Sequence, residues 1–358
     1  ELDLFGRLAR ASDAARLDAQ ASKALLQSTR LMVQAQVAQT YFALRALDAE
    51  RRLVRQTVAA HEETANLVER RYRAGDIAEL DLARARTELA STRSQALSLD
   101  RQRATLEHAL AVLVGEVASG FGVAEAEWAS APPQVPPGVP ATVLTRRPDV
   151  AAAQKSFEAA QARLGLARAA WFPDLSLTAS GGYASTDLGD LFKWSARAWG
   201  VGALLSLPLF DGGRRDATVR GAAATLDAAA ADYREQVLVA FRDVEDELAA
   251  LRLLQEQAGV VGQAVESASR ATALSDSRYR NGLVSQLELL DTQRSELASR
   301  RQALQVRAAQ YQASVGLVRA LGGGWEADKP APIAAQDIVV EAPSAVVWAP
   351  PGSGKAAE

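Results

Sequence analysis

The sequence predicts a mainly α-helical fold, in which two long antiparallel helical hairpins related by duplication flank a membrane β-hairpin. Three observations lead to this prediction: long tracts without proline, one internal repeat, and a segment in which apolar residues alternate with small or polar ones. The 358 residues carry 40 Lys+Arg against 43 Asp+Glu and include no Cys. The near-neutral net charge gives no overall positive potential that would attract nucleic acid. Without cysteine, the chain has no thiolate nucleophile and no Cys-ligated zinc site.

Proline positions define the helical tracts. All 13 prolines lie within 132–148, at 173 and 208, or from 330 onward, so two tracts lack the residue that breaks helices most strongly. Each tract is rich in strong helix formers and has one interruption, where a Gly follows a basic turn as it does at many helix ends. Each tract therefore predicts a helical hairpin whose longer arm extends about 90 Å. The expected arms are 14–72 and 78–114, then 216–279 and 285–321.

A shift of 207 residues relates the two tracts. It carries Tyr72 onto Tyr279 and Gly75 onto Gly282 in the interruptions, and it keeps register over about 110 residues without a gap. Chance matches would not keep one register over that length. The two hairpins are therefore predicted to be structural equivalents.

The segment between the hairpins changes character twice. A proline-rich stretch leads to Pro148, and Asp149 behind it suits the first turn of a short helix. Apolar residues then alternate with small or polar ones over 175–183 and again over 199–209. Two strands of about eleven residues with this pattern are typical of a transmembrane β-hairpin. Seven of the 20 aromatic residues lie within 171–210, as an interfacial girdle requires.

An ordinary soluble hairpin packed on the helices is the alternative for residues 174–210. A two-stranded hairpin is not stable alone in water, and long narrow helices offer little surface to cover it. Its apolar face therefore needs lipid or further copies of itself. The sequence contains no run of 18 or more apolar residues, so it predicts no membrane-spanning helix.

The repeat also gives an expectation about the start of the chain. Shifting the strand pair back by 207 residues places the end of a twin near residue 5, where Leu4 and Phe5 resemble Leu209 and Phe210. We expect that the chain starts inside this first β-hairpin. The rest of that hairpin, a leading helix and any export signal would then lie upstream of Glu1.

These patterns divide the chain into seven segments. In order, they are the end of a truncated first β-hairpin (1–5), the first helical hairpin (6–115), a Pro-rich connector (116–147), a short helix (148–170), the transmembrane β-hairpin (171–213), the second helical hairpin (214–322) and a C-terminal tail with a flexible end (323–358).

In five separated segments the chain resembles the outer-membrane efflux protein family, the TolC-like channels. The segments are Asp3-Leu4-Phe5-Gly6-Arg7; Arg147-Pro148-Asp149 with Ala169-Ala170-Trp171-Phe172-Pro173; Leu209-Phe210-Asp211-Gly212-Gly213; Arg278-Tyr279-x-x-Gly282 with Leu287-x-x-Leu290-Asp291; and Leu321-Gly322-Gly323-Gly324-Trp325. Each is weak alone, but their order on a duplicated scaffold is specific. Arg-Pro-Asp and Gly-Gly-Gly-Trp resemble the branch that serves resistance-nodulation-division pumps.

This resemblance implies a homotrimer that lies in the outer membrane and extends into the periplasm. Each chain of such a trimer gives four strands to one β-barrel and two helical hairpins to a tunnel. The implied partners are a periplasmic adaptor protein, an inner-membrane pump and outer-membrane lipid, and the implied function is passive exit of drugs or other small solutes. Many members of the branch are lipoproteins. Their lipid-bearing Cys would lie upstream of Glu1, so these residues do not decide whether the protein carries a lipid anchor.

The resemblance also implies roles at the hairpin tips. Leu287 and Asp291 match positions that ring the tunnel constriction, and Arg278 matches an arginine that tethers neighbouring hairpins. The turns would dock the adaptor through Ala74, Gly75, Asp76, Asn281, Gly282 and Leu283. Two alternatives remain: Asp291 pairs with Arg294 on a wet helix surface, or the turns have no partner.

Other function classes fit less well. A soluble trimeric coiled-coil scaffold explains the helices and the heptad spacing of Leu290, Leu297, Leu304, Tyr311 and Val318, but not the period-two segments. A pump adaptor usually carries one helical hairpin between compact β domains. An enzyme would need a convergent set of nucleophile, base or metal ligands, and none is visible. We expect His61 and His108 on helix surfaces, and the carboxylates at 243 and 245–247 exposed to solvent.

Overall fold

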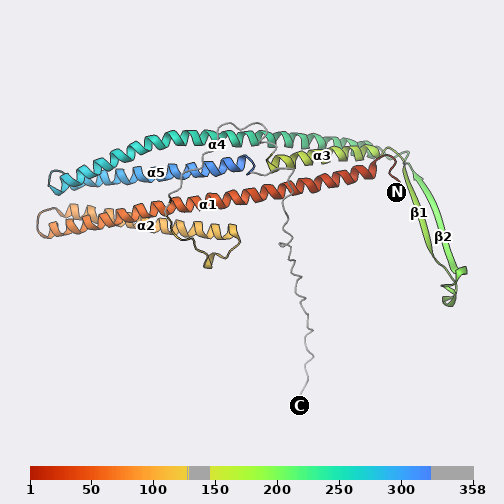
Figure 1. The fold of residues 1–358 in the computed structure, drawn as a ribbon, viewed down its shortest axis with the longest axis horizontal. Helices are drawn as coiled ribbons and strands as arrows, with labels where there is room; N and C mark the ends of the chain where they lie inside the picture. The colour runs from red at the N-terminus through yellow and green to blue at the C-terminus, as the bar shows by residue number, and fades with distance from the viewer. Residues whose placement is uncertain (127, 129–145, 324–358) are drawn as a thin grey trace, which may run out of the picture. The chain divides into compact units, whose positions relative to one another are not determined.

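The computed structural model describes residues 1–126, 128 and 146–323, so most of the expected connector and nearly all of the expected tail lie outside the described residues. The described elements follow one another along the chain (Figure 1) as α1 (Arg7–Arg73), α2 (Glu79–Val114), α3 (Pro148–Ala169), β1 (Asp174–Tyr183), β2 (Arg197–Ser206), α4 (Arg214–Arg280) and α5 (Gln286–Ala320). None of the helices in this part of the chain has the length and apolar character that a membrane-spanning helix needs.

The four predicted arms are present, and α1 starts earlier than predicted. Its first residue is Arg7 rather than one near 14, because Gly6 provides the left-handed turn before the helix with φ of 72°. The Asp3 carboxylate accepts the backbone N–H of Ala9 at 2.8 Å, which satisfies a donor of the first turn. Sequence analysis missed this start because the capping side chain lies several residues upstream of the helix.

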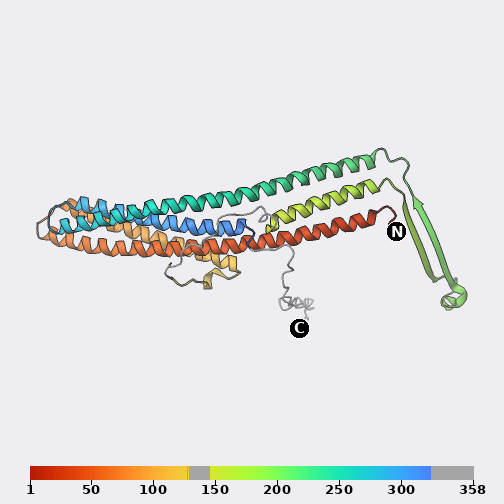
Figure 2. The same cartoon turned by 45° about the horizontal axis from the view of Figure 1, so that its top comes forward.

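The helices pack lengthwise in an order that differs from their order in the chain. α1 packs against α2, α3 and α5, and α4 packs against α3 and α5. In both ribbon views α5 and α3 lie end to end between α1 and α4 (Figures 1 and 2). The two helical hairpins are therefore joined through α1 and α5, and α3 continues the layer toward the β-hairpin.

Arg147 fixes the junction where α5 ends and α3 begins. Its side chain is 8% exposed and bonds Asp149 at 2.6 Å and Asp243 of α4 at 3.2 Å. It also donates to the carbonyl of Ala320 at 3.4 Å, in the last turn of α5. One guanidinium thus holds three helices together at this junction.

A buried ionic network around Asp48 joins α1 and α2 of the first hairpin. Asp48 of α1 is 1% exposed and lies between Arg45 at 3.2 Å, Arg51 at 3.5 Å and Arg103 of α2 at 2.7 Å. Arg45 also donates to the carbonyl of Ala124 at 2.7 Å, which holds the segment after α2 against the hairpin. The repeat shift places Gln255 and Gln310 where the first hairpin has Asp48 and Arg103, and these two amides lie 3.4 Å apart. The duplicated position has therefore diverged from a charged to a neutral contact.

The two strands form an antiparallel pair, as the predicted β-hairpin requires. Leu175 pairs with Leu205, Leu177 with Ala203 and Ala179 with Val201. Because paired residues point to the same side, the apolar sets of both strands share one face. That face is open in the described chain, and Val201 is 77% exposed.

The second strand ends earlier than the pattern suggested. Its last residue is Ser206, so Leu207 and Leu209 are not strand residues. Pro208 has no backbone N–H to extend the ladder. At the start of the chain, the N–H of Leu2 donates to the carbonyl of Leu175 at 2.8 Å, so this segment borders β1.

Three side-chain expectations on the helices were wrong. His61 is only 4% exposed, whereas His108 lies on the surface as predicted. Asp243 bonds Arg147, and Glu247 turns toward α5, where a Cβ on Gly316 would lie 2.1 Å from its carboxylate. Small residues on the facing helices make room for these polar groups.

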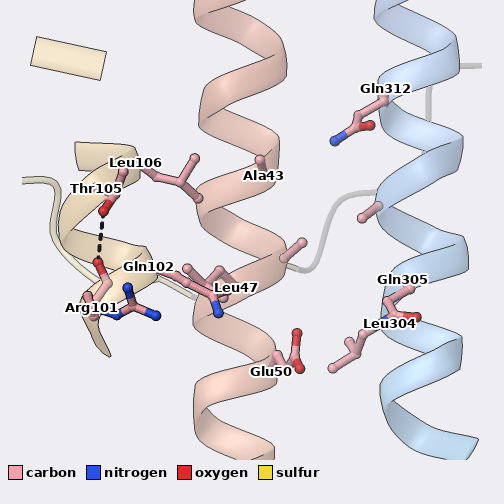
Figure 3. A pocket seen from close by; sticks show the side chains of 12 residues that line it. Ala43, Leu47, Glu50, Arg101, Gln102, Thr105, Leu106, Leu304, Gln305 and Gln312 are labelled. Atoms are coloured by element: carbon pink, nitrogen blue, oxygen red, sulfur yellow. Dashed lines mark hydrogen bonds between the residues drawn. The ribbon is translucent and has the colours of Figure 1, made fainter. Parts of the chain in front are cut away.

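The heptad seam of α5 faces the first hairpin over most of its length. Leu297 packs against the cluster of Leu47, Val54 and Leu99 in the first hairpin. Leu304 lines a pocket together with Leu47 of α1 (Figure 3), and the Tyr311 ring lies 4.7 Å from that of Phe42 in α1. Val318 is 46% exposed, so the seam leaves the contact near the end of α5. The seam therefore stabilises contact between the two hairpins of one chain.

Candidate functional site

The two helix turns that the sequence singled out lie at the same end of the molecule, opposite the β-hairpin (Figures 1 and 2). In the first turn, Asp76 N–H donates to the Arg71 carbonyl at 3.0 Å and Gly75 N–H to the Tyr72 carbonyl at 2.9 Å. In the second turn, Leu283 and Gly282 make the equivalent bonds at 2.9 and 3.0 Å. Both turns are Schellman motifs, with the Gly in the left-handed region.

The turns present their residues outward. Ala74, Gly75 and Asp76 in the first turn and Asn281, Gly282 and Leu283 in the second are all exposed. Leu283 is 68% exposed, and a Cβ added to either turn Gly would meet nothing within 4 Å. The six residues predicted to dock a partner therefore form two similar, accessible tips. We refer to these two turns, 74–78 and 281–285, as the paired tips.

Tyr279 holds the paired tips together just above the turns. It is 7% exposed, and the Arg71 guanidinium of α1 lies 5.5 Å from its ring centre. The pKa of the Tyr279 hydroxyl is raised, mainly by burial. Arg71 acts to lower this pKa and Asp81 to raise it. Arg71 and Asp81 belong to the first hairpin, so this contact joins the two hairpins. Sequence analysis identified Tyr279 only as part of a repeated motif.

The three constriction candidates lie on one arm of the second tip or beside it. Leu287 and Asp291 line a groove of about 410 Å³ between α4 and α5, together with Glu288. Leu287 is 43% exposed, and the Asp291 side chain is 64% exposed. Arg278 lies 4.0 Å from Glu288, within the same hairpin. The structure thus brings Leu287 and Asp291 to one surface and places Arg278 at its edge.

The alternative partner for Asp291 is only loosely placed. Arg294 approaches Asp291 at 3.9 Å, which is long for an ion pair at an exposed site. The same guanidinium donates from Nε to Glu88 of α2 at 2.9 Å. Arg294 therefore has its main partner on the first hairpin and leaves Asp291 largely free to meet solvent.

Two ion pairs connect the hairpins above the paired tips. Besides Arg294 with Glu88, Arg301 of α5 bonds Glu50 of α1 at 2.6 Å. Sequence analysis missed both pairs, because opposite charges separated by more than two hundred positions give no local signal. Among the residues that the structure describes, no group of three or more potential ligands could hold a metal ion.

Comparison with known proteins gives a consistent result. Residues 1–116 and 139–323 match the family model described as outer membrane efflux protein. OprJ, an outer membrane protein of Pseudomonas aeruginosa, is 34% identical over 91% of this chain and 68% of its own length. OpmQ, a pyoverdine export outer membrane protein of the same species, is 36% identical over 92% of this chain and 69% of its own length.

A solved structure has the same fold. The open state of the MtrE outer membrane channel of Neisseria gonorrhoeae superimposes with a TM-score of 0.80 at 31% identity, over 92% of this chain and 75% of that one. Family match, relatives and fold agree with the resemblance that the sequence motifs indicated. The chain therefore belongs to the outer membrane efflux protein family and is the outer-membrane component of an efflux pump.

Proposed function

We propose that the protein works as a homotrimeric exit duct, whose periplasmic tip is constricted at rest and opened by an adaptor protein of the pump. An inner-membrane pump, of the resistance-nodulation-division type, supplies the energy. The observation that carries this proposal is the pairing of an uncovered apolar strand face at one end with two exposed, equivalent turns at the other.

The strands support assembly with further copies, and the proposal takes the number of copies as three. The apolar face of β1 and β2 is open, and the outer edge of β2 carries unpaired backbone groups in the described chain. Closing strands from several copies into one barrel removes such edges and gives the apolar face to lipid. The long helices then continue as a tunnel wall.

The exposed Leu287 and Asp291 near the second tip support the proposed constriction. Three copies of Asp291 around one axis would place three carboxylates close together, with Leu287 beside them. Like charges at short range repel, retain cations and separate when the helices move slightly. We place Arg278 at the edge of this ring, where it tethers the tip in the resting state.

Adaptor docking is assigned to the paired tips. Gly75 and Gly282 allow the turns their tight backbone, and Leu283 offers the largest exposed apolar side chain of the six tip residues. A partner helix can therefore bury Leu283 while it contacts the small residues beside it. Relatives that are similarly identical to this chain are named for toluene efflux and for pyoverdine export. Channels this alike are named for different cargo, so we assign the selection of cargo to the inner-membrane pump.

Single-channel recording in planar bilayers tests the constriction. The change is Asp291→Ala in the protein as its host produces it, and we expect at least a several-fold rise in resting conductance because the carboxylate ring is lost. Asp246→Ala is the matched control, because Asp246 is also exposed, at 72%, and also lies 3.9 Å from an arginine, Arg242. Equal conductance in Asp291→Ala and the unchanged protein would remove the gating role.

A further inference from the structure

A buried histidine lies where the two hairpins meet, roughly three helical turns above the first turn of the paired tips. His61 of α1 is 4% exposed, and its Nδ1 lies 3.2 Å from Thr92 Oγ1 of α2. Thr92 Oγ1 donates its only proton to the Glu88 carbonyl at 2.9 Å. The proton between His61 and Thr92 must then sit on Nδ1, which makes Nε2 an acceptor.

His61 Nε2 has no hydrogen-bond partner within the described residues. Two charged groups act on the ring, Glu88 from α2 and Arg294 from α5. The Glu62 and Arg93 side chains form a separate exposed pair at 2.6 Å beside it. Burial lowers the pKa of His61, Glu88 raises it, and Arg294 lowers it. His61 is therefore neutral at neutral pH, next to the ion pair that joins the hairpins.

We propose that His61 is a proton-responsive element that weakens the Glu88–Arg294 bridge in acid and thereby favours opening of the paired tips. This regulation rests on the proposed channel function. A proton on Nε2 places a second cation beside Arg294, and both cations compete for one carboxylate. Because the site is buried, the new charge also lacks solvation until the hairpins separate.

The sign of the effect follows from proton binding. A solvated histidine has a pKa of about 6.5, and His61 in the closed arrangement binds its proton more weakly. At a pH above about 6.5 the His61 ring is neutral in both the closed and the open arrangement, and the closed form has its full stability. Below this pH the open form takes up protons first. The equilibrium then shifts toward opening by up to about tenfold per pH unit, until the lowered pKa is reached.

The chain provides its own controls. It has only two histidines, and His108 is exposed on α2. Burial also raises the pKa of Glu247, so that carboxylate is the other described side chain with a pKa shifted toward the same pH range. His108→Gln removes the other histidine, and Glu247→Gln removes the carboxylate whose pKa burial raises, so the two variants serve as controls for His61. Glutamine at position 61 keeps a polar side chain that cannot take up a proton in this range.

The test measures the distance between spin labels on the paired tips. The chain has no cysteine, so Ala74→Cys and Asn281→Cys can be labelled directly and compared at about pH 7.5 and about pH 5.5. We expect the distance to lengthen or broaden in acid, also in His108→Gln and Glu247→Gln, and to stay unchanged in His61→Gln. An acid response that survives His61→Gln, or no response in the parent protein, overturns the proposal.

A second measurement needs no substitution at position 61. Histidine hydrogen exchange followed by mass spectrometry reports the pKa of the His61 ring, and we expect a pKa below the ordinary histidine value of about 6.5. A His61 pKa at or above that ordinary value would overturn the proposal even if His61→Gln does not fold. Bilayer recording over the same pH range separates the two proposals: a label response without any conducting steps contradicts the channel function and leaves the proton response intact.

Discussion

At the scale of single residues, buried arginines bond carboxylates and backbone carbonyls of neighbouring segments, both within helices and at a helix end. Arg147 is the clearest case, since it bonds Asp149 and Asp243 and also donates to the Ala320 carbonyl. A helix end leaves unpaired carbonyls, and a guanidinium can satisfy them while it pairs with carboxylates. The Arg-Pro-Asp motif therefore has a physical role at the α5–α3 junction.

Arg147→Ala should lower the free energy of unfolding by about 3 kcal/mol, because two carboxylates lose their buried partner. Denaturant unfolding in detergent measures this change. Arg242→Ala is the control: Arg242 bonds the same Asp243 at 2.9 Å but is 64% exposed, so its loss should cost less than about 1 kcal/mol. Equal losses in the two variants would contradict the assigned role.

The same site gives a pH dependence with a definite sign. Burial raises the pKa of Asp149, but the bonds to Arg147 lower it by more, so the net shift of this pKa is downward. A carboxyl whose pKa is lowered in the folded protein stabilises the fold fully at pH values above its ordinary pKa of about 3.9. That contribution is lost as the pH falls through the lowered pKa. Arg147→Ala should therefore also remove part of the acid sensitivity of unfolding below about pH 4.

The residue scale is also where sequence analysis was least reliable. His61 was expected on a helix surface and Glu247 in solvent, but His61 is buried beside Thr92, and Glu247 is half-buried beside Gly316. Such burial depends on which helix faces another, and periodicity within one helix does not contain that information. The pairing of Glu88 with Arg294 was missed for the same reason.

At the scale of elements, the sequence predicted most boundaries because they are encoded locally. Gly75 and Gly282 end their helices with left-handed turns, and Pro148 starts α3. The strands were predicted from alternation, which also fixed the shared apolar face. The end of β2 was misplaced because alternation continues past Ser206, although Pro208 removes a ladder donor.

The two faces of the β-hairpin should respond oppositely to charge. Val201 lies on the open apolar face and Thr178 on the other face, and the two side chains have similar shapes. Val201→Arg should reduce membrane insertion or stability by about 2–4 kcal/mol, because it places a charge against lipid near mid-strand. Thr178→Arg should be tolerated, since its face would line the water-filled interior. Membrane fractionation of both variants checks this, and similar losses would contradict the assigned faces.

At the scale of the whole molecule, the duplication produced two hairpins with the same turns but different contacts. The first hairpin carries the buried network around Asp48, and the second carries amides at the equivalent positions. The hairpins meet through the Glu88–Arg294 and Glu50–Arg301 pairs, which lie between the paired tips and the α5–α3 junction. These two ion pairs are partly exposed, whereas the Tyr279–Arg71 contact nearer the tips is buried. The ion pairs can break without unfolding the helices.

Electron cryomicroscopy of the protein extracted from the outer membrane tests the central claim most directly. We predict three copies around a continuous axial cavity, with strands 174–206 in the membrane region and the paired tips closing the far end. Asp291 of each copy should face the axis at that closure. A single copy, an assembly without an axial cavity, or tips turned away from the axis would contradict the account of an export channel.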